Sequence, residues 1–491
     1  MRKEIKQKNK LKDNKILYWI IVGICIAFCF FGRFIPIPTM TAQSVGLVFI
    51  FIPTIILWMV SGLVWPSLLC LVALGFLGYG DGSTGFGFVI KSSFGDSTWV
   101  FLLFTFVLMF ALTETPVFKR IALAFVNNNI ARKNGHLFVF LFMLGVLLIG
   151  CFTSPTVLFA LIYPILKEIF FLAKVKKGDK IGKYMILALC FTVSISSGMT
   201  PIAHVFCVQV MKVAQVQISM LQYTAFAFPL GLVAFLLMIG TFLLILKKKD
   251  VACLTNVNVA SIKSSLPKMN EQELLSIIVF CVVIILWVLP STLQSAAPEF
   301  YNFMNSTLGI AIPPLIGSTV LAIIEIKNKK VLDVVQAMKS NVPWSSLLVC
   351  AAALAIGAAF KPTGLSATLE TAFQQGFGNV PAIALFIILI IWTLVETNFS
   401  SNLVTATVVA TITLNLQKVI AVSLNYSAVV AVLGCLSGLA FATPPGHPNV
   451  ALTVDSEYAD GKQTLGFGMM TAGYSAIAAI AVGYPIAMCV M

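Results

Sequence analysis

Two short segments, SISSGMTPIAH at residues 194–204 and LSGLAFATPPGH at residues 436–447, decide the fold. Each ends in the pattern Thr-Pro-x-x-His, although the chain contains only three histidines. The patterns begin at Thr200 and Thr443, so the second follows the first after 243 positions. Both interrupt apolar stretches with Gly and Pro, which break a helix and free its terminal backbone groups. A break of this kind placed twice indicates an internal repeat.

The chain is apolar over most of its length. Hydrophobic residues make up 59% of the 491 residues and charged residues 10%, whereas soluble domains carry about 25% charged residues. A helix needs about 20 apolar residues to cross the hydrocarbon layer. The segments predicted to cross number eleven: Leu17–Gly32, Val45–Trp65, Ser67–Gly80, Trp99–Thr113, Tyr184–Val213, Thr224–Leu246, Leu274–Pro290, Leu308–Ile326, Trp344–Phe360, Tyr426–Val454 and Gly466–Val490. The sequence therefore predicts an all-α polytopic membrane protein.

The basic residues indicate the orientation in the membrane. The net charge is +14, but the lysines and arginines cluster in short loops between apolar segments, so we expect no nucleic-acid partner. With the N-terminus and its polar leader on the cytoplasmic side, 27 basic residues fall inside and 5 outside. This layout predicts an integral plasma (inner) membrane protein with an extracytoplasmic C-terminus. The eleven cysteines form no CxxC pair, and there is no GxxxxGK[ST] loop that would bind a nucleotide.

Two longer apolar stretches, His136–Phe171 and Pro381–Leu416, break near their middles at TSPT and ETNFSSN. Irregular backbone at membrane depth must be buried in protein or line a wet cavity, so each stretch predicts a re-entrant helical hairpin. The breaks at Ser154 and Ser401 are 247 positions apart, close to the shift between the Thr-Pro-x-x-His patterns. Each half then has five crossings and one hairpin, and an odd number of crossings predicts inverted-topology repeats.

The repeat divides the chain into four predicted parts. These are a leader with scaffold helices at 1–135, a first transport half at 136–246, a cytosolic loop with scaffold helices at 247–365, and a second transport half at 366–491. Each transport half contains one hairpin and one broken helix. In transporters with inverted repeats the substrate binds between the halves, near the middle of the membrane.

The candidate site lies at four breaks, which come in two pairs. Their segments are Ser154–Thr156, Ser197–Pro201, Ser400–Asn402 and Ala442–Pro445. The N–H groups at the start of a helix attract an anion, whereas freed carbonyl groups suit a cation. Small hydroxyl and amide side chains at the breaks add neutral donors and acceptors. The pattern therefore predicts an anion site with a cation nearby.

The chain resembles the divalent anion:sodium symporter family of the ion-transporter superfamily, whose members carry dicarboxylates, citrate or sulfate. The resemblance covers nearly the whole chain and includes FALTETPVFKRIALAF, both hairpins, FATPPGHPN and FGMMTAGYSAIAAIAVGYPI. Each hairpin tip of that family carries a Ser-Asn-Thr motif, and this chain has Ser154-Pro155-Thr156 and Ser401-Asn402-Leu403 instead. Pro155 offers neither an amide oxygen nor an N–H, and Leu403 offers no hydroxyl.

The resemblance implies a set of site residues. Substrate contacts are expected from Ser401, Asn402, Thr443 and Pro444, with Ser154, Thr156, Thr200 and Pro201 as first-half counterparts. Sodium as a coupling ion is expected near Ser154, Gly198, Asn402 and Ala442. The resemblance also implies a homodimer that moves its substrate by an elevator mechanism, and no covalently bound cofactor.

Three ionisable residues are candidates for coupling. A protonated His204 or His447 beside a broken helix would supply positive charge, because an imidazole titrates near pH 6.5. Alternatively, both rings are neutral and hydrogen-bonded within the break. Glu396 lies before the second hairpin tip, where it would hold a cation or a proton, or pair structurally with Lys361 or a backbone group.

The sequence thus predicts a secondary active transporter of small divalent organic anions, such as succinate, malate, 2-oxoglutarate or citrate. Sodium, protons or exchange for a counter-anion would drive it. The alternative function is a permease or channel for an inorganic oxyanion such as sulfate or arsenite. We expect no enzymatic activity, because a doubled hairpin has no role in a hydrolase. The expected partners are the dianionic substrate, the lipid bilayer and a second copy of the chain.

Overall fold

The structure is a computed structural model that describes residues 15–38, 40–79, 85–126, 133–203, 205–257, 266–293, 296–377, 380–456 and 458–491. The first half contains α2 (Lys15–Phe31), η1 (Gly32–Phe34), α3 (Ala42–Ser61), α4 (Val64–Leu77), α5 (Gly85–Ser92), α6 (Ser97–Thr113), α7 (Val117–Val126), α9 (Gly135–Gly150), α10 (Pro155–Leu172), α11 (Lys180–Gly198), α12 (Phe206–Val213), α13 (Met220–Ile245), α14 (Lys248–Val251) and η2 (Ala252–Asn256). The second half contains α16 (Glu271–Thr292), α17 (Pro298–Thr307), α18 (Ile312–Ile323), β1 (Glu325–Ile326), β2 (Lys329–Lys330), α19 (Val334–Ser340), α20 (Trp344–Ala359), α21 (Leu365–Phe377), α22 (Ala382–Phe399), α23 (Asn402–Asn415), α24 (Gln417–Ile420), α25 (Tyr426–Leu436), α26 (Pro448–Asp455), α27 (Gly461–Ala478), η3 (Ala479–Gly483) and α28 (Tyr484–Val490).

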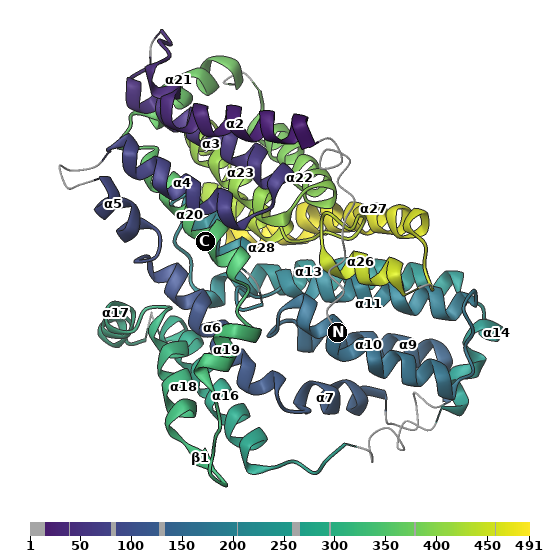
Figure 1. Ribbon diagram of the computed structural model, residues 1–491. Coiled ribbons are helices and arrows are strands. Elements are labelled where there is room, and N and C mark those ends of the chain that lie inside the picture. Colours follow the sequence, from purple (N-terminus) through teal and green to yellow (C-terminus); the bar gives the residue numbers. More distant parts are fainter. Residues whose placement is uncertain are drawn as a thin grey trace.

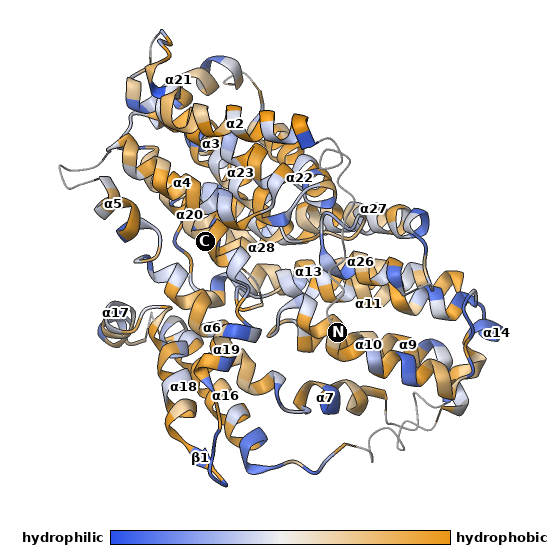
Figure 2. Ribbon diagram, in the orientation of Figure 1, coloured by the Kyte–Doolittle hydropathy of each residue, from blue (hydrophilic) through white to orange (hydrophobic). Residues whose placement is uncertain are grey.

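Apolar helices make up almost all of this structure, which confirms the predicted fold class. Among the described residues, eight helices are long and apolar enough to cross a membrane, or ten if each of two bent pairs is one span. Shorter apolar helices account for further predicted crossings, among them α4 and α18. Polar colouring is concentrated at loops such as those around β1 and α14 (Figure 2).

Both predicted hairpins are present. Helices α9 and α10 pack against each other and are separated by residues 151–154, and α22 and α23 are separated by Ser400 and Ser401. The first hairpin packs on α11, the second packs on α25 and α27, and α13 packs against both α11 and α27. The two hairpins therefore lie on either side of a layer formed by α11, α13 and α27 (Figure 1).

The repeat extends to short helices that were not predicted: α5 and α19, which precede the predicted crossings α6 and α20, and α7 and α21. Helices α5 and α6 are bent by 46° at their junction, and their counterparts α19 and α20 by 83°. The short helices α7 and α21 precede the two hairpins in the same way. Helices of about ten residues next to a membrane span have no length signal that separates them from loops, because isolated helices this short are marginal.

The two broken helices form the centre of the molecule. Nearly every residue of α11 is buried, whereas α2, α13 and α22 expose apolar side chains such as Leu244, as expected for helices in contact with lipid. Helix α27 passes directly over the second break. A Cβ added at Gly468 would lie 2.5 Å from the Cα of Ala442, so only glycine permits this approach.

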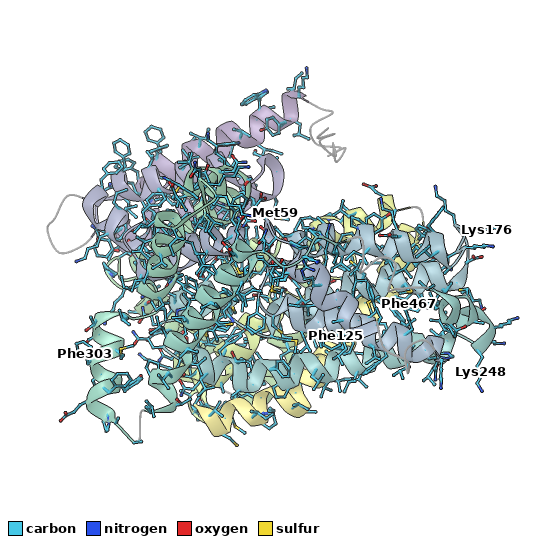
Figure 3. All side chains as sticks on the ribbon, turned by 90° about the horizontal axis from the view of Figure 1, so that it is seen from below. Met59, Phe125, Lys176, Lys248, Phe303 and Phe467 are labelled. Atoms are coloured by element: carbon cyan, nitrogen blue, oxygen red, sulfur yellow. The ribbon has the colours of Figure 1, made fainter. Side chains whose placement is uncertain are left out.

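Two of the basic loops lie together at one end of the molecule. Lys176 precedes α11 and Lys248 begins α14, and both lie at the same edge (Figure 3). Helix α14 packs on α9 and α11, which brings the two loops together. This grouping agrees with the side that the charge pattern assigns to the cytoplasm, and the orientation of the termini stays a prediction.

Candidate functional site

A cavity of about 740 Å³ lies where the hairpin tips and the broken helices meet. The first hairpin contributes Ser154 to Val157, the second contributes Phe399 to Val404, and the second broken helix contributes Pro444 to Pro448. The ends of α3 and α19 complete the wall, including Met59 and Asn341. The structure therefore brings both halves of the repeat together around a single chamber.

Several helices begin at this chamber. The first residues of α10, α12, α23 and α26 are all among its lining residues. Each helix start carries about half of a positive elementary charge, and α10, α12 and α23 have no side-chain cap on their first N–H groups, whereas α26 is capped by His447. No Asp, Glu, Lys or Arg is found among the described residues that line the chamber. Its electrostatic character therefore comes from small polar side chains and backbone dipoles: the helix starts favour an anion, and the C-terminal ends of α3, α19 and α22, which also line the chamber, favour a cation nearby.

The two Thr-Pro-x-x-His breaks use their threonines in the same way. The Thr443 hydroxyl donates a hydrogen bond to the backbone oxygen of Asn398, at the tip of the second hairpin. Likewise, the Thr200 hydroxyl donates to the backbone oxygen of Cys151, at the tip of the first. The acceptors are 247 positions apart, so the contact itself is repeated. Each hydroxyl holds a broken helix to its hairpin, and neither threonine lines the chamber.

Asn398 was not predicted as a site residue, although it lies within ETNFSSN. Its buried side chain joins the second hairpin to the second break. The Oδ1 atom accepts hydrogen bonds from the N–H groups of Phe441, at 2.7 Å, and Ala442, at 2.8 Å. The Nδ2 atom donates to the carbonyl groups of Leu394, at 2.7 Å, and Leu439, at 3.3 Å. This side chain therefore positions the hairpin tip against the break.

Asn402 adds a second connection between the same two elements. Its Nδ2 donates to the carbonyl of Gly438 at 3.2 Å. The hydroxyl of Thr397 lies 2.7 Å from Asn402 Oδ1 and 2.5 Å from the carbonyl of Ser437. The amide of Asn402 is thus largely engaged inside the protein, even though the residue borders the chamber.

His447 borders the chamber and is buried. Its Nδ1 accepts a hydrogen bond from the backbone N–H of Asn449 at 3.2 Å, which caps the start of α26. A protonated imidazole carries a hydrogen on both nitrogens and would lose this bond. The arrangement fits the alternative in which the ring is neutral and hydrogen-bonded in the break. His204, the other coupling histidine, lies outside the described residues.

Three serine side chains at the hairpin tips remain available to a ligand. Ser154 and Ser401 are the N-cap residues of α10 and α23, and neither side chain makes a capping hydrogen bond. The buried Ser400 hydroxyl has no partner among the described residues. All three line the chamber; Ser400 lies in a predicted break but was not among the predicted substrate contacts. Polar groups without partners in a cavity are the groups that a bound ligand would satisfy.

The residues predicted to bind sodium have fewer oxygen atoms free to coordinate an ion. The carbonyl of Gly198 accepts hydrogen bonds from the hydroxyl of Tyr223, at 3.0 Å, and from Cys435 Sγ, at 3.4 Å. Both lone pairs of this oxygen are therefore engaged. Ser154 lines the chamber, whereas Gly198 and Ala442 do not. Sodium at these positions stays a prediction.

The predicted substrate residues fall into two groups. Ser154, Thr156, Ser401, Asn402 and Pro444 line the chamber. Thr200, Pro201 and Thr443 lie behind its wall, where the two threonines hold the hairpins.

Glu396 lies outside the chamber wall, on α22. Among the described residues it forms no ion pair with Lys361 and no side-chain hydrogen bond. The structural pairing that the sequence left open is therefore not present.

Two broken helices and two hairpins around a shared chamber, within a bundle of apolar helices, define a membrane transporter. The family comparison agrees with this. Residues 47–435 match the model of the citrate transporter family CitMHS, so the chain belongs to that family and is an integral membrane protein. The match confirms the resemblance to anion transporters that the sequence motifs indicated.

Two relatives extend the comparison. The chain is 23% identical over 310 residues to "Uncharacterized transporter MJ0672" of Methanocaldococcus jannaschii, which covers 61% of this chain and 63% of that relative's length. The crystal structure of the YdaH transporter of Alcanivorax borkumensis, described as having an unusual topology, superposes with a TM-score of 0.54 at 13% identity. That superposition covers 91% of this chain and 97% of the other. At this identity the similarity concerns the fold alone.

Proposed function

We propose that this protein is a secondary active transporter of small organic anions with two or more negative charges, such as succinate, malate, 2-oxoglutarate or citrate. The observation that supports this most is the chamber, where helix starts from both halves converge and no described lining residue carries a formal charge. A cluster of helix N-termini stabilises negative charge, and the lack of carboxylates removes repulsion.

The anion is proposed to bind between the two hairpin tips. Ser154, Ser400 and Ser401 would donate hydroxyl hydrogen bonds to its carboxylates, together with the N–H groups at the starts of α10 and α23. Bonds from neutral donors to a charged acceptor are roughly twice as strong as neutral ones. Residues that hold the tips, such as Asn398 and Thr443, keep these donors aimed at the chamber.

Transport is proposed to proceed by an elevator movement of the two transport halves within a homodimer. The hairpins and broken helices are joined to each other by side-chain hydrogen bonds, which would let them move as a unit. The driving force would be sodium, protons or exchange for a counter-anion.

Counterflow in proteoliposomes tests the proposal. Vesicles with the full-length protein are loaded with unlabelled anion, and uptake of the same radiolabelled anion is followed for succinate, malate, 2-oxoglutarate, citrate and sulfate. A transporter shows saturable uptake that internal anion accelerates, at least for one organic anion. A channel shows no such acceleration. Uptake of sulfate alone would instead favour the oxyanion alternative.

A thermal-shift panel with the same anions, each with and without sodium, identifies the substrate and the coupling ion. Ligand that binds the folded state raises its stability, by about 2.7 kcal/mol at 100 times the dissociation constant. No shift with any organic anion, together with no counterflow, would refute the proposed function.

A further inference from the structure

We propose that His447 binds the transported anion as a neutral hydrogen-bond donor, through the N–H group at its Nε2 atom, an inference that rests on the transport function proposed above. His447 lines the chamber and is almost entirely buried. The sequence indicated this residue only as a candidate for coupling. The structure places its two ring nitrogens in different surroundings, which gives each of them a separate role.

The chain on either side of His447 fixes the position of this residue. Pro448 is the first residue of α26, and the residue before a proline is kept in the extended region. His447 accordingly has a φ of −152° and a ψ of 138° and is the N-cap residue of α26. A Cβ added at Gly446 would lie 2.7 Å from the backbone oxygen of Thr397 and 3.1 Å from that of Asn398. His447 therefore follows directly on a close contact with the tip of the second hairpin.

The hydrogen bond at Nδ1 decides which nitrogen carries the hydrogen. Nδ1 accepts from the backbone N–H of Asn449 at 3.2 Å, so it has a lone pair and no hydrogen. In a neutral imidazole the single hydrogen is then on Nε2, which becomes a donor. A second proton would remove the cap and place a positive charge at the positive end of a helix, and both effects are unfavourable. The break therefore holds the ring as a neutral donor.

The Nε2 atom has no hydrogen-bond partner in the part of the chain that the structure describes. There, the bond to Asn449 is the one hydrogen bond of the His447 side chain. Buried polar groups are almost always paired, and this donor belongs to a residue that lines a cavity. No described lining residue is Asp or Glu, so a carboxylate acceptor has to come from a bound ligand.

His447 extends the proposed anion site from the hairpin tips to the second broken helix. Ser154 and Ser401 offer hydroxyl donors from the two tips, and His447 offers an N–H group from the start of α26. A hydrogen bond from a neutral donor to a carboxylate is roughly twice as strong as one between neutral groups. Because the ring stays neutral, it binds the ionised anion without taking up a proton. Its contribution should therefore persist above the pH at which a free imidazole titrates.

Two substitutions separate the roles of the nitrogens. In His447→Asn the amide oxygen replaces Nδ1 as the cap, since Asn is among the best N-cap residues, and nothing replaces Nε2. In His447→Gln the longer side chain brings an amide N–H group near the position of Nε2, and the cap is lost. Calorimetry gives the dissociation constants of succinate, malate, 2-oxoglutarate and citrate at a pH of about 8, where a free imidazole is neutral. The denaturant midpoint of each purified variant is measured alongside.

The two variants should differ in opposite ways. His447→Asn is expected to keep the denaturant midpoint of wild type and to raise the dissociation constant about tenfold or more. His447→Gln is expected to lower the midpoint and to keep the dissociation constant within about threefold. His136→Asn is the control, because it removes an imidazole whose Nε2 lies 2.7 Å from the carbonyl oxygen of Leu246, outside the chamber wall. It should bind the anions like wild type.

Each variant is decisive even if the other does not fold. An unchanged dissociation constant in His447→Asn, or a tenfold rise in His447→Gln, overturns this inference alone. A midpoint of His447→Asn that falls as far as that of His447→Gln assigns the residue a structural role and overturns the inference as well. If wild type binds none of the four anions and performs no counterflow with them, the proposed function fails and the inference falls with it.

Discussion

Replacing Asn398 by leucine should loosen the second hairpin from the second broken helix. Leucine has a similar shape but removes four hydrogen bonds, to Phe441, Ala442, Leu394 and Leu439. The N–H groups of residues 441 and 442 would then be buried without a partner. Each such group costs about 1–3 kcal/mol, so the expected loss in the free energy of unfolding is about 2–6 kcal/mol.

Asn415→Leu is the matched control. Asn415 is also buried on the same hairpin, but its side chain makes a single hydrogen bond, from Nδ2 to the carbonyl of Thr411 at 2.7 Å, and its Oδ1 is already unpartnered. Its replacement should cost about 1 kcal/mol or less.

Both free energies are measured by denaturant titration of the purified protein in mixed micelles. The affinity for the transported anion is measured alongside by calorimetry, and it should fall for Asn398→Leu while Asn415→Leu stays close to wild type. If the two variants unfold at the same denaturant concentration, or if Asn398→Leu binds the anion like wild type, the positioning role assigned to Asn398 is wrong.

Three other substitutions test separate parts of the structure. Ser401→Ala removes a chamber hydroxyl that makes no capping hydrogen bond. The dissociation constant of the anion, measured by calorimetry, should rise about tenfold, while the free energy of unfolding stays within about 0.5 kcal/mol of wild type. An unchanged dissociation constant would exclude contact between Ser401 and the substrate. Gly468→Ala places a Cβ against the backbone of the second break and should lower the free energy of unfolding by about 1–3 kcal/mol. Gly473→Ala, on the same helix with open space around it, should raise it by about 0.5–1 kcal/mol. If the denaturant midpoint of Gly468→Ala is not below that of Gly473→Ala, the close packing of α27 on the second break is wrong. Glu273→Gln breaks the salt bridge between Glu273 of α16 and Arg120 of α7, in which Arg120 Nε lies 2.8 Å from Glu273 Oε1. The free energy of unfolding should fall by about 3 kcal/mol, and the anion affinity should not change. A stability equal to wild type would show that the pair is dispensable.

The amino-acid sequence by itself determined the class of fold and the position of the breaks. The length of the apolar segments predicts the spans, and clusters of Gly, Pro and small polar residues within a long apolar stretch favour a helix break. That is why TSPT, ETNFSSN and the two Thr-Pro-x-x-His patterns predicted hairpins and broken helices that the structure contains. The short helices α7 and α21 were missed because their length and composition resemble those of loops.

Only the tertiary structure decided what each side chain at the breaks does. Thr200 and Thr443 were predicted to contact the substrate. In the structure both hydroxyls donate to the backbone of a hairpin, and neither residue lines the chamber. Asn398 became the main link between two elements more than 40 positions apart, and Glu396 was left without a counter-charge. A helix break is a local property of the chain, whereas the partner of a polar group depends on which distant elements pack against it, and that is settled only when the two halves meet.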